Sequence, residues 1–73
     1  MLVEVNLSDQ SSQERARFAS NARTSVEALV RLSKDEETYV REAVAGNKST
    51  PAEVLVRLSK DENTSVRKTV QIN

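Results

Sequence analysis

The chain repeats itself with a period of 26 residues, and this repetition constrains its fold more than any other feature. Residues 24–47 align without a gap with residues 50–73, and 15 of these 24 positions are identical. A fixed period of this length is typical of proteins built from stacked supersecondary units. We therefore expect one helical-repeat domain over residues 1–73. It divides into a degenerate N-terminal capping half-repeat (1–23), a repeat (24–49) and a second repeat (50–73).

Apolar residues recur within each repeat at helical spacing. In residues 26–34 they cover about half of a helical circumference, so we expect neighbours on two sides of this segment. In residues 39–45 they occupy a narrower face. A single glycine and a single proline also suit a helical chain. The pattern predicts an all-α fold with helices near residues 11–21, 25–34, 38–46, 51–60 and 64–71.

The ends of these helices carry capping signals. Residues 24–27 and 50–53 both begin with threonine and end with glutamate, and residues 11–14 form a weaker serine version. This spacing is typical of a capping box, in which the hydroxyl accepts a backbone amide and the glutamate reaches back. At the C-terminal ends, Asn21 and residues 46–47 predict a left-handed closing residue.

Residues 40–61, VREAVAGNKSTPAEVLVRLSKD, resemble the variant leucine-rich repeat family, which is similar in turn to HEAT-type helical repeats. The resemblance implies a short right-handed α-solenoid of paired short helices, with about two and a half 26-residue repeats. The family usually has proline after the asparagine, where this chain has Ala22 and Lys48. Some members hold a cysteine-ligated iron–sulfur cluster, which a chain without cysteine cannot bind. An ordinary strand-lined leucine-rich repeat fails, because Lys34 replaces a required leucine.

Aspartate and arginine also recur with the period, each aspartate six residues before an arginine. In HEAT-type repeats a similar spacing makes a ladder in which each arginine bridges neighbouring aspartates. Stacked repeats place like residues in rows, and alternating charge lets a row attract. The alternative is that the arginines face an acidic ligand. The predicted ladder residues are Asp9, Arg15, Asp35, Arg41, Asp61 and Arg67.

Composition argues against catalysis and cofactor binding. The chain has neither cysteine nor histidine, which removes a cysteine nucleophile, the commonest general base and the commonest metal ligand. The carboxylates of residues 35–37 and 61–62 recur once per repeat, as structural positions do, and lack the loop glycine of a calcium site. We expect no enzyme activity, no metal and no cofactor.

We expect a noncatalytic scaffold for protein–protein interaction, because solenoids present extended surfaces for recognition. Residues that differ between repeats are the natural contacts, and Tyr39 is the best of them, unless it packs at the seam between helices. The alternative is nucleic-acid binding through an arginine stripe on the inner helices. Against it stand 11 basic and 11 acidic residues and only two aromatic ones. The predicted contacts are Glu37, Tyr39, Glu42, Asn63, Ser65 and Lys68.

The two ends of the repeat array differ. The first helix has the polar residues Glu14 and Arg17 at positions that are apolar later, which suits a terminal cap, and Phe18 should fill the first core layer. Residues 1–7 form either a remnant helix or an extended arm. No segment resembles a signal peptide or a membrane span, so we expect a cytoplasmic protein. The last layer lacks a following repeat, which predicts weak self-association through Leu55, Leu58, Val66, Val70 and Ile72.

Overall fold

A computed structural model describes residues 11–73, which form five short α-helices and no β-strand. The predicted all-α class is confirmed, and every predicted helix end lies within two residues of the observed one. Asp9 and the segment 1–7 lie outside the described residues. No described helix is long and apolar enough to cross a membrane. The helices are α1 (Ser12–Ser20), α2 (Val26–Leu32), α3 (Thr38–Gly46), α4 (Ala52–Leu58) and α5 (Thr64–Ile72).

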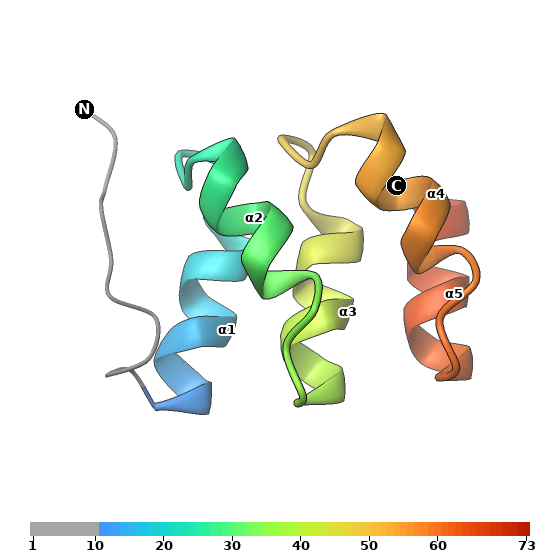
Figure 1. Ribbon diagram of the computed structural model, residues 1–73, viewed down its shortest axis with the longest axis horizontal. Helices are drawn as coiled ribbons and strands as arrows, with labels where there is room; N and C mark the ends of the chain where they lie inside the picture. The colour runs from blue at the N-terminus through green and yellow to red at the C-terminus, as the bar shows by residue number, and fades with distance from the viewer. Residues whose placement is uncertain (1–10) are drawn as a thin grey trace.

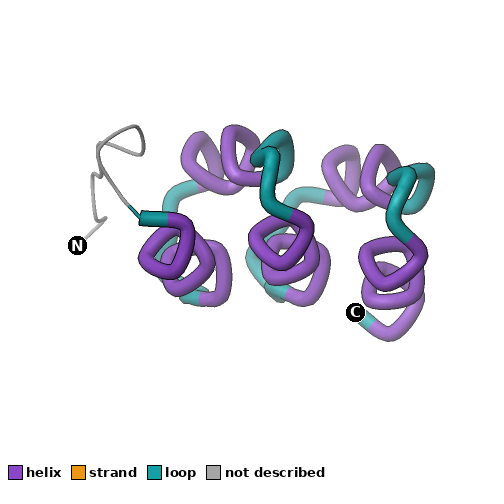
Figure 2. The backbone as a smooth tube through the Cα atoms, turned by 90° about the horizontal axis from the view of Figure 1, so that it is seen from below, coloured by secondary structure: helices purple, strands orange, loops and turns teal. Residues whose placement is uncertain are grey.

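The helices lie in two layers, which Figure 1 and Figure 2 show from two directions. One layer holds α1, α3 and α5 side by side, with α3 packed against both neighbours. The other holds α2, which packs on α1 and α3, and α4, which packs on α3 and α5. Each helix of the second layer therefore covers a seam of the first, and every 26-residue unit contacts the unit before it.

The core lies between the two layers and follows the apolar pattern of the sequence. Leu29, Leu32 and Val40 are buried in the middle of it. Burial of such a side chain contributes about 1.5–3 kcal/mol relative to exposure. Phe18 is partly buried and packs against this cluster, as expected for the first core layer. Val26 departs from the expectation of cover on two sides, because it is 54% exposed at the start of α2.

The threonines of the two predicted capping boxes do not cap helices, so that prediction was wrong. Ser25 caps α2 by accepting a hydrogen bond from the amide of Ala28, and α4 begins after Pro51 without a side-chain cap. Thr24 and Thr50 are buried, and their hydroxyls donate to carbonyls at the end of the preceding helix, at 2.5 and 2.7 Å. These carbonyls belong to the last turn of a helix, and each also accepts the backbone amide of the asparagine that ends that helix. In the weaker box of residues 11–14, Ser11 caps α1 as predicted by accepting the amide of Glu14.

The predicted left-handed residues at the helix ends were also wrong. No described residue has a positive φ. Asn21 and Asn47 are extended, with φ of −85° and −81° and ψ near that of a strand. The side-chain amide of Asn21 instead accepts the backbone amide of Arg23, and that of Asn47 contacts the preceding repeat.

Candidate binding surface

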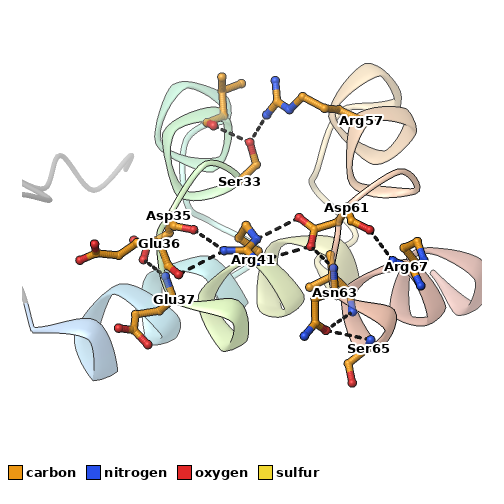
Figure 3. A network of polar contacts seen from close by, with 12 residues as sticks. Ser33, Asp35, Glu36, Glu37, Arg41, Arg57, Asp61, Asn63, Ser65 and Arg67 are labelled. Carbon is orange, nitrogen blue, oxygen red and sulfur yellow. Dashed lines mark hydrogen bonds and ion pairs between the residues drawn. The ribbon is translucent and has the colours of Figure 1, made fainter.

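Ion pairs join each repeat to the next. The Nε of Arg15 lies 2.7 Å from Oδ2 of Asp35, and the Nε of Arg41 lies 2.9 Å from Oδ1 of Asp61. Both pairs are two-pronged, since a second guanidinium nitrogen approaches the other carboxylate oxygen. The two arginine side chains are only 17% and 11% exposed. Figure 3 shows Arg41 between the two loops that carry these aspartates.

Each of the later arginines also binds the aspartate six residues before it, through its carbonyl and not its carboxylate. Nη1 of Arg41 donates to the carbonyl oxygen of Asp35 at 2.7 Å, and Nη1 of Arg67 donates to that of Asp61 at 2.6 Å. The same guanidinium of Arg41 thus fixes a loop in its own repeat and takes a carboxylate from the next. The expected bridging between aspartates is present in this asymmetric form. Arg67 also donates to Thr64, and no described carboxylate lies within ion-pair distance of it.

The ladder carboxylates shape the loops between paired helices. Asp35 accepts the amide of Glu37, and Asp61 accepts the amide of Asn63, each at 2.9 Å. Burial acts to raise the pKa of Asp61. The hydrogen bonds from Asn63 and Arg41 and the nearby positive charges outweigh burial, so the pKa lies below its ordinary value. Asp61 is therefore held as an acceptor for two donors at once.

A second ladder, of asparagines, was missed by the sequence interpretation. Nδ2 of the buried Asn47 donates to the carbonyls of Ala19 and Asn21 in the preceding repeat, at 2.7 and 3.0 Å. Its Oδ1 accepts the amide of Ser49. Asn73 repeats this arrangement one layer later, on the carbonyls of Ala45 and Asn47. The recurrence of asparagine at positions 21, 47 and 73 was the signal, although it was read as helix capping.

Tyr39 stands out among the residues that differ between repeats. It is 44% exposed at the start of α3, and its hydroxyl donates to the hydroxyl of Ser12 on α1. Tyr39 therefore reaches across the seam between two helices of the first layer and keeps much of its ring in solvent. Both expectations for Tyr39, a packed seam residue and an exposed contact, describe part of this arrangement.

The other predicted contacts divide into free and occupied side chains. Ser65 and Lys68 of α5 are exposed, whereas Glu42 of α3 is partly buried and accepts a long hydrogen bond from Thr69 at 3.4 Å. Asn63 caps α5 by accepting the amides of residues 65 and 66. Glu37 occupies the same cap position in α3 but makes no capping hydrogen bond, so its carboxylate is left for other contacts.

The predicted arginine stripe is not an exposed feature of the described chain. Arg15 and Arg41 are held by carboxylates, and Arg41 and Arg67 by carbonyls, as Figure 3 shows for the last two. No group of three acidic side chains within residues 11–73 is arranged to hold a metal ion. A groove between the two loops mixes acidic and basic side chains, and within it Arg41 binds Asp61 and Arg57 binds Ser33.

These features define a helical-repeat protein, in which identical residues make identical contacts at successive layers. Residues 39–63, which comprise most of α3, all of α4 and the loop after it, match the leucine rich repeat variant family. The resemblance noted for residues 40–61 is thereby confirmed over this segment. No curated protein and no solved structure matches the chain significantly.

Proposed function

We propose that this chain is a noncatalytic scaffold that binds another protein on the exposed face of α3 and α5. The observation that carries the proposal is the ordered exposure of Tyr39, whose hydroxyl is held by Ser12 while 44% of the residue stays in solvent. A tyrosine offers a large contact area, and one that is already fixed loses little conformational entropy on binding.

The residues that recur are unsuited to this role, because their polar groups are used between repeats. Hydrogen bonds within and between repeats already occupy the polar side chains of Arg41, Asp61 and Asn47. The contacts must then come from the differing positions near the starts of α3 and α5, where Tyr39, Glu42 and Ser65 lie. This division supports a rigid frame whose specificity is set by a few variable side chains.

We also propose that the repeats form a short right-handed α-solenoid of about two and a half units. The recurrence of the same ion pair and the same asparagine bridge at successive layers supports the stacking. The right-handed sense follows from the resemblance to the variant leucine-rich repeat.

Affinity capture followed by mutation tests the binding proposal. The wild-type chain should retain a protein partner that the double variant Tyr39→Ala, Glu42→Ala loses. The matched control is Lys48→Ala, Glu53→Ala, which removes two exposed side chains elsewhere and should leave capture unchanged. Equal capture by both double variants would contradict the proposed face. The nucleic-acid alternative would be favoured if the chain bound DNA or RNA with an affinity that falls steeply with salt. In that case Arg67→Ala should reduce the slope of log affinity against log salt concentration by about one unit.

A further inference from the structure

The outward side of α4 and α5 carries exposed and partly exposed apolar side chains. Leu29 is fully buried, whereas Leu55, one period later, is partly exposed. Val56 is 58% exposed and Ile72 is 84% exposed. The predicted terminal layer is thus only partly open, since Leu58 and Val66 are buried within the core. The end patch consists of Leu55, Val56, Val70 and Ile72.

The side chain of Ile72 disfavours a further repeat stacked on this patch in the same register. Where α5 packs on α3, a Cβ added to Gly46 would lie only 3.3 Å from Cγ2 of Thr69. The period places Ile72 at the position of Gly46. A next helix stacked as α5 is on α3 would therefore have to give way to the branched side chain of Ile72, which favours an occupant of a different geometry.

The opposite end of the repeat array does not complement the patch either. On α1, Glu14 and Arg17 stand where the next repeat has Val40 and Ala43, and both are exposed. Docking an apolar patch on these side chains would remove two charges from water without supplying partners, which is unfavourable. Head-to-tail stacking of two copies is therefore disfavoured at both of its surfaces.

We propose that the end patch binds the same patch of a second copy of this chain, in a two-fold pair whose α5 helices run antiparallel. Such an interface is self-complementary, so apolar meets apolar on both sides. Charge supports the antiparallel orientation. Lys68 is exposed one turn before Ile72 on α5, and an antiparallel pairing centred near Ile72 brings it beside the C-terminal end of the second copy's α5. The last carbonyls of a helix carry partial negative charge and attract a cation.

Sedimentation equilibrium on the whole 73-residue chain tests this pairing. Over about 10 µM to about 1 mM protein we expect a reversible dimer with a dissociation constant on the order of 0.1 mM. Ile72→Glu should weaken it at least about tenfold. Val26→Glu is the matched control. Like Ile72, Val26 is an exposed β-branched apolar residue, but it lies at the start of α2, away from the patch. A strict monomer up to the highest concentration would overturn the proposal.

Ile72→Gly separates the two-fold pair from head-to-tail stacking. In the two-fold pair it removes the central apolar contact and should give a monomer. In stacking it restores the close approach seen at Gly46, so association should strengthen and continue beyond the dimer. Lys68→Glu should weaken the pair several-fold, and an unchanged dimer in that variant would exclude the antiparallel orientation. We expect each variant to fold, because the substituted positions are exposed. The helical circular dichroism spectrum of each variant checks this.

Discussion

Arg41 and Asp61 belong to successive repeats, and their side chains meet through two nitrogens and two oxygens, the closer pair 2.9 Å apart. The same guanidinium holds the carbonyl of Asp35 within its own repeat. One side chain thus fixes a loop and a layer contact together. Residues of this kind should affect the stability of the fold before they affect any binding function.

Asp35→Ala should lower the free energy of unfolding by about 1–3 kcal/mol. The substitution removes the partner of Arg15 and the acceptor for the amide of Glu37. Urea denaturation measures the loss, with Glu36→Ala as the control, since the neighbouring Glu36 side chain is exposed. Equal transition midpoints for Asp35→Ala and wild type would show that the ladder does not stabilise the fold.

Asn47→Ala should destabilise the chain by about 2 kcal/mol or more, because it leaves buried polar groups without partners. Asn47→Asp is the sharper variant. It keeps the acceptor for Ser49 but turns a carboxylate toward two carbonyls, so it should be worse than alanine. Thermal unfolding tests whether Asn47 bridges two repeats or serves only as a turn acceptor, since a turn acceptor alone would tolerate aspartate.

Substitutions at Thr50 and Glu53 distinguish the observed hydrogen bond of Thr50 from a reciprocal capping box. Thr50→Ala removes the buried donor to the Val44 carbonyl and should cost about 1–3 kcal/mol. Glu53→Ala should cost less than about 1 kcal/mol, because Glu53 is exposed and only favours the helix start through its charge. Equal losses in chemical denaturation would instead support a reciprocal capping box.

Asp61 should make the chain less stable in acid. Its pKa is lowered in the folded state, so its contribution is complete above the ordinary aspartate pKa of about 3.9 and is lost as the pH falls through the folded value. The free energy of unfolding of wild type should therefore fall more steeply below about pH 4 than that of Asp61→Asn. Glu62→Gln, a change at the exposed neighbouring residue, should keep the wild-type slope. Parallel curves for wild type and Asp61→Asn would contradict the prediction.

The helices could be predicted from the sequence because the period and the apolar spacing agree. Identical residues at positions 29–36 and 55–62 must satisfy the same surroundings twice, which leaves little freedom in the local fold. The caps could not be predicted in the same way. The hydroxyls of Thr24 and Thr50 bind carbonyls at the end of the preceding helix, and that contact depends on how the chain turns back.

The two ladders differ in how visible they are in a sequence. Aspartate and arginine pointed to contacts between repeats, because both partners are side chains and their charges are opposite. Asn47 and Asn73 recur with the period, but they donate to backbone carbonyls, which every residue has, so the residue pattern does not reveal their partners. The sequence also could not predict that Ile72 is exposed and Leu58 buried. Both are apolar and lie in the same repeat, so the difference depends on how the helices pack.

Because each arginine and asparagine of the ladders reaches only the adjacent layer, the array has a natural unit of evolutionary growth. Duplicating 26 residues between α2 and α5 would supply every new donor with its acceptor and every new acceptor with its donor. An insertion of another length inside a helix would shift one row against the next and break both ladders at once. Genes for such chains should therefore lengthen and shorten in whole repeats, while single-residue insertions persist only in the loops.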